Sequence, residues 1–432
     1  MREPGDACEP EEVVRSPLPR GPALAGGTVE KRSRTDTLET TLRLLEVEST
    51  LRPYLGETGY LQYLTEVTGL SSGELVRRFE AAPEEARRAV QELQAALFEP
   101  GVASASVDTS RIEAVLAREE KLSFSGFYGP DLMAEVARYA LVVGEVARHE
   151  PFDVVHAHDW MTYPAGIVAA RISGKPLVVH MHACEYDRSG EHVNERVRAL
   201  EQLGLGAADR VICVSHYTAN TLRTRYQVDP DRLRVVHNAV THKDQVEGWH
   251  WEKHMPEPIV LFLGRVTFQK GPDYFLEAAA RVVKVEPRVK FVMSGSGDML
   301  PKMIERSARL GLARHIHFTG FLKGDDVERM YAMADIYVMP SVSEPFGISP
   351  LEAMALDVPV ILSRQSGVSE ILRNALKVDF WDVQDMANKI LALIRYPSLA
   401  RQLTEEGRDE LSTFRWDVRG KLVREVYEEV VA

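Results

Sequence analysis

Two neighbouring stretches decide the fold, DLMAEVARYALVVGEVARH (131–149) and FDVVHAH (152–158). The first carries apolar residues every three or four positions, which is typical of a helix, and the second is the short apolar run of a buried strand. Short apolar runs of this kind recur at KPLVVHMH (175–182), ADRVICVS (208–215) and DRLRVVHN (231–238), with a helical segment between successive runs. Apolar strands that alternate with helices predict an α/β fold with a parallel sheet covered on both faces.

A second series of strands follows residues 241–257, a polar stretch that we interpret as a linker. Five apolar runs with helices between them predict a second complete α/β unit: PIVLFLGR (258–265), VKFVMSGSG (289–297), HIHFTGF (315–321), ADIYVMPS (334–341) and VPVILS (358–363). Two such units joined by a linker predict Rossmann-like domains that face each other across a cleft, at the carboxyl ends of their strands, where doubly wound sheets bind ligands.

The residues before these units show other patterns. Residues 1–36 are rich in Pro, Gly, Arg and Glu without periodicity, which predicts a disordered tail. Residues 37–100 show amphipathic-helix spacing. The expected parts after the tail are a helical N-terminal region (37–123), a first Rossmann-like domain (124–255), a second (256–415) and a C-terminal helix that can cross back to the first domain (416–432).

Composition excludes several classes of function. The formal net charge of −12 argues against a general binder of nucleic acid or acidic membranes, because no basic field would attract phosphates. No apolar run approaches the ~20 residues of a membrane span, and the start lacks a signal-peptide stretch. Cys8, Cys184 and Cys213 fit neither a disulfide framework nor a zinc site, so we expect a cytoplasmic protein. An anionic substrate would need locally placed cations.

The strongest chemical motif is SVSEPFGISPLEAMALDVPVILS (341–363). The proline after Glu344 biases that residue to an extended conformation, and Gly347 permits a sharp turn before a helix. The N–H groups of such a turn can bind phosphate without a cation. A capping box with Ser349 as the N-cap would explain Glu352 without any ligand. A loop carboxylate such as Glu344 more often does chemistry than packing.

The segment LFLGRVTFQKGPDYFLEAA (261–279) contains the required cations. Arg265 and Lys270 lie on a loop between a strand and a helix. Lys270 would lie at the positive end of the helix dipole, and a bound anion would resolve that conflict. Arg265 offers bidentate donors to such an anion and Lys270 a point charge, although either alone could be a solvated loop charge. VMSGSG (292–297) holds only half of a dinucleotide fingerprint, so we interpret it as a tight turn and expect no nicotinamide cofactor.

Two histidine-containing segments, HAHDW (156–160) and HMHACEYDRSG (180–190), follow strands of the first unit. We expect His180 and His182 to lie on opposite faces of their strand, which argues against both binding one metal ion. A single histidine as a hydrogen-bond partner or acid/base group fits better. The motif Asp229-Pro230-Asp231 fits turn chemistry better than a metal site.

Together these segments resemble the retaining GT-B glycosyltransferases of the group 1 family, glycosyltransferase family 4. The match runs from about residue 124 to 430, and its most specific element is the E-x7-E spacing from Glu344 to Glu352 between GRVTFQKG and EAMALDVPVI. Within the family the chain is most similar to a glycogen-synthase-like branch, through HAHDWMTYPAG, EYDRSG and QSGVSEILRNALKVDFWD. The resemblance implies a nucleoside-diphosphate sugar as donor, a saccharide acceptor and retention of anomeric configuration, with neither a metal nor a cofactor.

The resemblance implies roles for residues of the second domain. Arg265 and Lys270 would neutralise the donor diphosphate. The backbone of Gly347, Ile348 and Ser349 would bind the distal phosphate. These five residues would therefore hold the charge of the leaving group.

It also implies roles around the transferred sugar. Glu344 would face that sugar, and Glu352 would hold the ribose hydroxyls. His182 would touch the donor sugar near the reacting carbon, with Asp159 near the acceptor. Asn238 would lie at the domain junction. Glu344 and His182 are thus the expected catalytic residues.

The chain departs from the family at its start. The family opens with a strand and a glycine-rich loop, and only Gly26-Gly27 is a stand-in here, with no apolar strand before it. We therefore expect an incomplete N-terminal domain. Three functions stay open: a hexosyltransferase, with glucose as the favoured sugar and a glucan or other saccharide as acceptor; a truncated or non-catalytic nucleotide-sugar-binding protein; and a nucleotide-sugar epimerase, against which the E-x7-E spacing argues.

Overall fold

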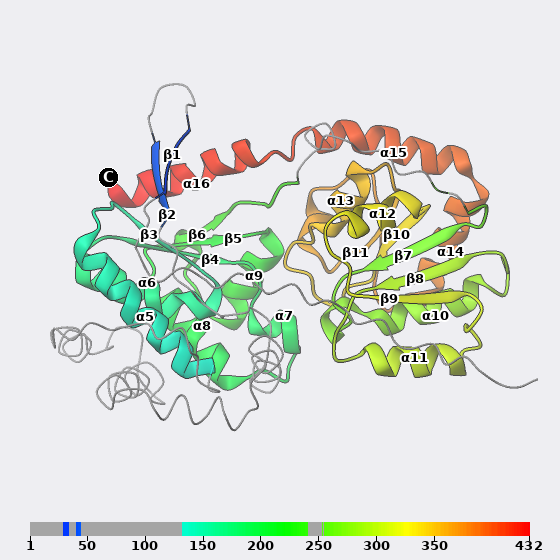
Figure 1. Cartoon of the computed structure of the whole chain (residues 1–432), viewed down its shortest axis with the longest axis horizontal. Helices are drawn as coiled ribbons and strands as arrows, with labels where there is room; N and C mark the ends of the chain where they lie inside the picture. Colours follow the sequence, from blue (N-terminus) through cyan, green and yellow to red (C-terminus); the bar gives the residue numbers. More distant parts are fainter. Residues whose placement is uncertain (1–28, 34–39, 45–131, 241–252, 254) are drawn as a thin grey trace, which may run out of the picture. The chain divides into compact units, whose positions relative to one another are not determined.

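The structure is a computed structural model that describes residues 29–33, 40–44, 132–240, 253 and 255–432 (Figure 1). The chain divides into two compact units, residues 1–49 and residues 50–432. The stand-in Gly26-Gly27 and the helical pattern over residues 45–100 lie outside the described residues.

The described part of the first unit is an antiparallel strand pair, β1 (Val29–Ser33) and β2 (Thr40–Leu44). Val29 lies opposite Leu44, and Ser33 lies opposite Thr40. The structure contradicts the helix expected for the residues of β2 and the disordered tail expected for those of β1. The helical spacing was misleading because a segment as short as TTLRL fits a period of two as well as one of 3.6.

The second unit contains a four-stranded parallel sheet in the order β3-β4-β5-β6, as the apolar runs predict. Its strands are β3 (Val155–His158), β4 (Leu177–Met181), β5 (Arg210–Cys213) and β6 (Leu233–Val235). The helices around it are α5 (Leu132–His149), α6 (Asp159–Ser173), α7 (Glu185–Ser189), α8 (Glu195–Ala207) and α9 (His216–Arg225). Residues of α5, α6 and α8 pack with Val179 and Val211 in a core on one face of the sheet.

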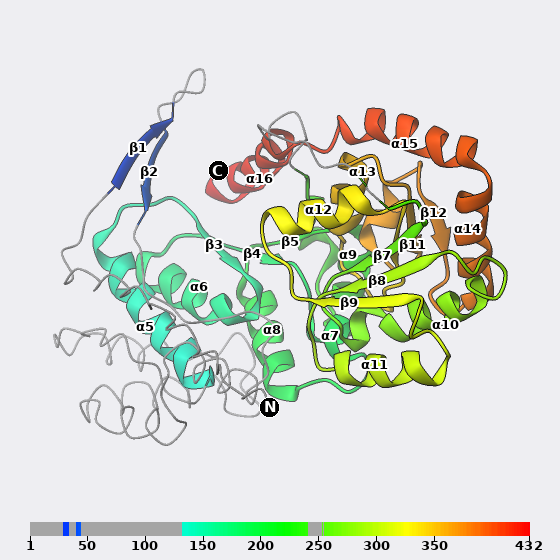
Figure 2. The same cartoon turned by 45° about the vertical axis from the view of Figure 1, so that its right-hand side comes forward.

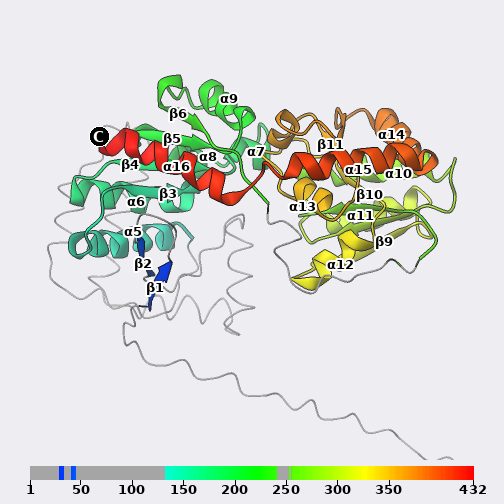
Figure 3. The ribbon, with the colours of Figure 1, turned by 90° about the horizontal axis from the view of Figure 1, so that it is seen from above.

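The opposite face of this sheet is covered by helix α16 (Trp416–Val431). Val426 is buried against Val178, Ile212 and Val236. Glu429 forms ion pairs with Arg210 of β5 and Arg234 of β6. Figure 3 shows α16 lying along this sheet, after α15 (Pro397–Leu411). The chain therefore returns to its first sheet after it has completed the second.

The second sheet has six parallel strands in the order β12-β11-β10-β7-β8-β9, and Figure 2 shows β9 at one edge. The strands are β7 (Ile259–Leu263), β8 (Lys290–Ser294), β9 (Ile316–Gly320), β10 (Ile336–Met339), β11 (Val360–Ser363) and β12 (Leu376–Val378). The first five match the predicted apolar runs. β12 was not predicted, because LKV is too short to stand out as an apolar run.

Helices cover both faces of the second sheet, which confirms the doubly wound arrangement. They are α10 (Pro272–Val282), α11 (Leu300–Arg309), α12 (Asp325–Met333), α13 (Ser349–Ala355) and α14 (Val383–Arg395). Phe275 of α10 and Ile390 of α14 are buried on one face, and Leu351 of α13 on the other. Among the described residues, no helix is both long enough and apolar enough for a membrane span.

Candidate functional site

The loops that follow β7 and β10 bring Lys270 and Glu344 together. Lys270 is the last residue of a short 3-10 turn before α10, and its Nζ donates to Oε2 of Glu344. Ser341 Oγ donates to the same oxygen at 3.1 Å. The side chains of Lys270 and Glu344 are 19% and 8% exposed, so solvent screens this ion pair only weakly. In the structure, the cation at the positive end of the helix is therefore compensated by Glu344.

Arg265 is tied into the same loops through Gln269. Its Nη2 donates to Oε1 of Gln269 at 3.1 Å, and the backbone carbonyl of Gln269 accepts from the N–H of Val342 at 2.9 Å. Gln269 is buried although it is polar. Gln269 was not among the predicted site residues, and its only signal in the sequence was its place between Arg265 and Lys270.

The two loops meet backbone to backbone at Gly271. This residue has φ 63°, and a Cβ there would lie 2.2 Å from the carbonyl oxygen of Pro340. Only glycine fits that approach without displacing the backbone. Gly295 of the half fingerprint serves a similar purpose, because a Cβ there would lie 1.8 Å from the carbonyl oxygen of Gly264. The G-x-G is thus a tight turn, as predicted.

Helix α13 begins at Ser349, and its start differs from the expected capping box. Ile348 is the N-cap, and no side chain caps the helix. Glu352 instead accepts a hydrogen bond from the hydroxyl of Tyr331 at 3.0 Å. Burial raises the pKa of Glu352, and the Tyr331 hydrogen bond offsets part of that rise. The capping role therefore does not explain Glu352.

A small cavity lies among these residues at the carboxyl ends of β7 and β10. Three of its lining side chains are polar, those of Lys270, Ser341 and Ser349. Apolar and aromatic residues form the rest of the lining: Phe262, Leu263, Tyr337, Val338 and Met339. Gly347, with φ 98°, turns the chain beside it, and a Cβ there would lie 3.2 Å from Cγ of Glu344.

Asp159 and His182 come together at the carboxyl ends of β3 and β4. The carboxylate of Asp159 accepts from the N–H of His182 at 2.8 Å and from that of Ala183 at 3.4 Å. Asp159 has φ 57°, a left-handed conformation that is uncommon for a residue with a side chain. Such strain persists where surrounding contacts impose it, and it is frequent at functional sites.

Hydrogen bonds join the Glu344 loop to residues of the first sheet's helices. Ser343 Oγ donates to Asp187 Oδ1 at 2.6 Å and lies 3.0 Å from the hydroxyl of Tyr217. Ser215 Oγ donates to the carbonyl of Pro345 at 2.5 Å. The sequence did not predict a role for Ser215, Ser343 or Tyr217, because nothing local distinguishes them from surface polar residues.

Glu370 provides a second connection. Its carboxylate accepts from the backbone N–H groups of His216, at 3.0 Å, and Tyr217. Nε2 of His237 lies 3.5 Å from the same carboxylate, next to the half-buried Asn238. Burial alone would raise the pKa of Glu370, but the interaction with His237 and the backbone hydrogen bonds from His216 and Tyr217 outweigh it and lower the pKa.

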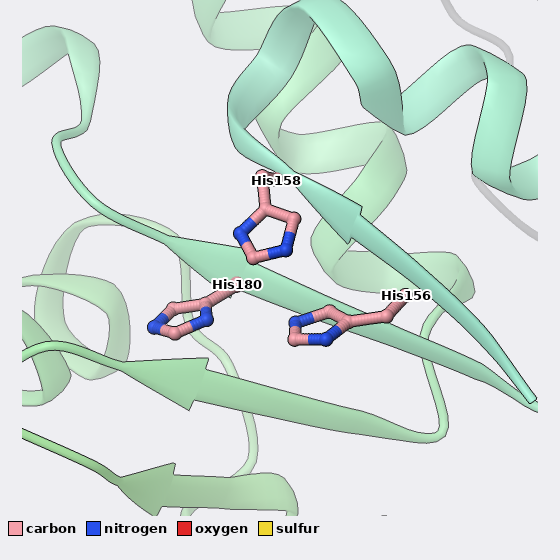
Figure 4. Close-up of side chains that lie close together, drawn as sticks. All are labelled: His156, His158 and His180. Atoms are coloured by element: carbon pink, nitrogen blue, oxygen red, sulfur yellow. The ribbon is translucent and has the colours of Figure 1, made fainter. Parts of the chain in front are cut away.

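Four stacked histidines lie on one face of β3 and β4, and we call them the histidine ladder: His156, His158, His180 and His182. Figure 4 shows the first three. The ring centroids of His156 and His158 are 4.3 Å apart, as are those of His180 and His182. The expectation that His180 and His182 lie on opposite faces is therefore wrong. Residues i and i+2 of a strand point to the same face, because side chains alternate with a period of two.

The environment of the ladder disfavours the charged form of its rings. Burial, followed by repulsion from the neighbouring histidines, lowers the pKa of His156 to about 3. The same causes lower the pKa of His180 further.

The Asp229-Pro230-Asp231 motif forms a turn. The Asp229 carboxylate accepts from the N–H of Asp231 at 3.0 Å within a 3-10 turn, so this motif is turn chemistry as predicted.

Comparisons with known sequences match both halves of the chain. Residues 86–244 match glycosyltransferase family 4, and residues 246–410 match glycosyl transferases group 1. A D-inositol 3-phosphate glycosyltransferase of Mycobacterium sp. (strain JLS) is 31% identical over 361 residues, which cover 78% of this chain and 82% of that protein. An uncharacterized glycosyltransferase of Methanocaldococcus jannaschii is 32% identical over 238 residues, which cover 52% of this chain and only 61% of that protein.

Solved structures share the fold. Sucrose-phosphate synthase from Thermosynechococcus elongatus has a TM-score of 0.60 at 22% identity, covering 71% of this chain and 82% of that chain. Anabaena HepE in complex with UDP-glucose has a TM-score of 0.58 at 21% identity, covering 68% of this chain and 82% of that chain. None of these named proteins is a glycogen synthase, so the similarity to a glycogen-synthase-like branch stays a prediction. Both family matches and the 31% identity along most of a named relative place the chain in glycosyltransferase family 4, as a nucleotide-sugar-dependent glycosyltransferase.

Proposed function

We propose that the chain transfers a hexose, with glucose as the first candidate, from a nucleoside-diphosphate sugar to a saccharide with retention of configuration. The observation that carries the proposal is the Lys270–Glu344 pair beside a cavity that Ser349 also lines. The leaving group of such a reaction is a diphosphate, so placed cations that stabilise its developing charge matter more than a strong general acid. UDP-glucose is the donor to test first, because the similar fold of Anabaena HepE has been solved with it.

The ion pair suggests how donor binding prepares the site. A diphosphate arriving at the carboxyl ends of β7 and β10 would compete with Glu344 for the ammonium group of Lys270. Once Lys270 turns to the phosphate, the Glu344 carboxylate is released to face the sugar. Arg265, held by Gln269, would add bidentate donors to the same phosphates.

Other residues of the second sheet would position the nucleotide. The backbone of Gly347, Ile348 and Ser349 would bind the distal phosphate. Glu352 would accept from the ribose hydroxyls, and its hydrogen bond with Tyr331 would fix the orientation of the carboxylate. These assignments follow the family resemblance.

Residues of the first sheet would contact the reacting sugars. His182 would touch the donor sugar, as the family resemblance implies, and the hydrogen bond from its backbone N–H to Asp159 fixes the chain at the end of β4. Asp159 would lie near the acceptor, and Asn238 would lie at the junction of the two domains. The acceptor class stays a saccharide, with a glucan first. Inositol phosphate and sugar phosphates belong in the same screen, because the names of two similar proteins contain inositol 3-phosphate and sucrose phosphate.

The first experiment measures UDP release from UDP-glucose by the purified chain with each acceptor, followed by NMR of the product anomer. Release that depends on an acceptor, with retained configuration, supports the proposal. Glu344→Gln should lower kcat by a factor on the order of 10² to 10³. It should leave UDP affinity unchanged or tighter, because Lys270 loses its competing carboxylate. Measurable UDP binding with no transfer to any acceptor would favour the nucleotide-sugar-binding protein instead.

Lys270→Ala tests the phosphate role separately. It should weaken UDP binding, measured by calorimetry, by about tenfold or more, as expected when a charged hydrogen bond of about 1.5–3 kcal/mol is lost. Lys284→Ala removes the same charge from an exposed position and should leave UDP affinity unchanged. Equal affinities for the two variants would remove Lys270 from the donor site.

A further inference from the structure

The histidine ladder contains ring nitrogens that the proposed transfer reaction does not use. His158 lies directly opposite His180 in the register of β3 and β4, and His156 lies two residues before His158 on the same face. Each of these three residues has one ring nitrogen that lies within 4.8 Å of a ring nitrogen of both others. Figure 4 shows the three rings gathered over the two strands.

His180 is the least explained member. It is 7% exposed, and both of its ring nitrogens are buried with no hydrogen-bond partner among the described residues. A buried polar group left without a partner costs about 1–3 kcal/mol. A ligand bound between His180, His156 and His158 would remove this cost.

The other two histidines each keep one nitrogen available while the second is held. Nδ1 of His156 lies 2.6 Å from the hydroxyl of Tyr427, and its Nε2 is buried without a partner among the described residues. Nδ1 of His158 lies 2.9 Å from Nε2 of His182, which leaves Nε2 of this exposed residue for a ligand. Histidines that bind metals show this pattern, because a partner on the second nitrogen fixes the tautomer and the ring orientation.

From this arrangement we propose that His156, His158 and His180 bind a divalent transition-metal ion, with Zn²⁺ as the first candidate. Neutral imidazoles are ligands of zinc, copper and nickel, whereas magnesium and calcium require oxygen ligands. Three histidines with an open fourth position form a known tetrahedral zinc arrangement. Zinc–nitrogen bonds of about 2.0–2.1 Å place the nitrogens about 3.3 Å apart, so side-chain rotations must bring them closer than in the structure.

The ion would join two strands and fix a neighbouring ring. Because His158 would bind the metal through Nε2, its Nδ1 would carry the proton and donate to Nε2 of His182. The metal would thereby select the tautomer of His182 and clamp the carboxyl ends of β3 and β4. The ion itself would take no part in the transfer reaction, which the family resemblance describes as metal-independent.

The test is zinc titration of the full chain, free of any affinity tag and stripped of metal by a chelator, in competition with a chromophoric chelator. We expect one zinc ion per chain and a rise in Tm on saturation, because an ion that binds only the folded state stabilises it. His158→Gln and His180→Asn should each weaken zinc binding at least 100-fold. Tyr427→Phe, which loses only the partner of His156, should weaken it about 10-fold.

Controls distinguish this site from other histidines. His317→Gln alters an exposed histidine of β9 and should bind zinc as tightly as wild type. His250→Gln combined with His254→Gln removes a second pair of nearby histidines in the sequence and should also have no effect. If that double variant alone loses zinc, or if His158→Gln binds as tightly as wild type, the proposal fails. His158 is exposed, so this variant stays informative even if His180→Asn does not fold.

Discussion

At the scale of single residues, backbone shape decides where the cations of the site lie. Lys270 reaches Glu344 because the chain turns sharply at Gly271, immediately after the lysine. The carbonyl of Pro340 fills the space that a side chain at Gly271 would need. Gly271 is therefore needed for two reasons, its positive φ and the close approach of the second loop, and a comparison with a glycine that has only a positive φ can separate the two effects.

Gly271→Ala should destabilise the protein by about 2–4 kcal/mol, because it combines backbone strain with a steric clash. Gly174→Ala is the matched control, since Gly174 has φ 68° but no atom within 4 Å of the added Cβ. It should cost only the strain of about 1 kcal/mol. Urea unfolding measures both. Equal losses would show that the approach of Pro340 is unimportant.

At the scale of secondary-structure elements, α16 is the part of the chain that connects distant sequence regions. It belongs to neither series of strands and helices, yet it covers one face of the first sheet. Its contact is a small apolar cluster flanked by the ion pairs of Glu429 with Arg210 and Arg234. The buried residue Val426 is the centre of this contact.

Val426→Ala should lower the free energy of unfolding by about 1–3 kcal/mol, because it removes buried methyl groups and leaves a cavity. Val431→Ala, at a position that is 51% exposed in the same helix, should change it by less than about 0.5 kcal/mol. Thermal unfolding followed by circular dichroism compares the two. Similar values would mean that α16 does not stabilise the sheet.

The elements themselves were largely predictable, because apolar strands alternating with helices follow from local periodicity. The cations Arg265 and Lys270 were found for a similar reason, since they stand at a strand-to-helix loop. The side-chain contacts between distant segments were not predictable. The hydrogen bond between Tyr331 and Glu352 joins residues of different helices, and local sequence carries no sign of it. The histidine ladder was missed through a wrong assignment of strand faces.

At the scale of the whole molecule, Glu370 is a carboxylate on which several separate segments converge. The backbone of His216 and Tyr217 donates to it from α9, and His237 lies close to it after β6. Glu370 itself belongs to the segment between β11 and β12. Its lowered pKa means that its ionised form contributes to the stability of the fold.

Glu370→Gln should cost about 1–2 kcal/mol at pH 7, because the hydrogen bonds lose their charged acceptor. The contribution of a carboxyl with a lowered pKa is fully present above the unfolded value of about 4.3 and is lost as pH falls through the folded value. The stability difference between wild type and variant should therefore shrink below about pH 4. Glu305→Gln, at an exposed position, is the control. A difference that does not depend on pH would contradict this role.

The return of α16 to the first sheet has a consequence during synthesis on the ribosome. Roughly 180 residues separate the end of β6 from the start of α16. At translation rates of about 5–20 residues per second, the nascent first sheet waits roughly 10–40 s for its covering helix. Throughout that interval the apolar side chains of Val178, Ile212 and Val236 lack the helix that buries them. We expect chaperones to bind the nascent chain at this face, and to leave it when α16 emerges.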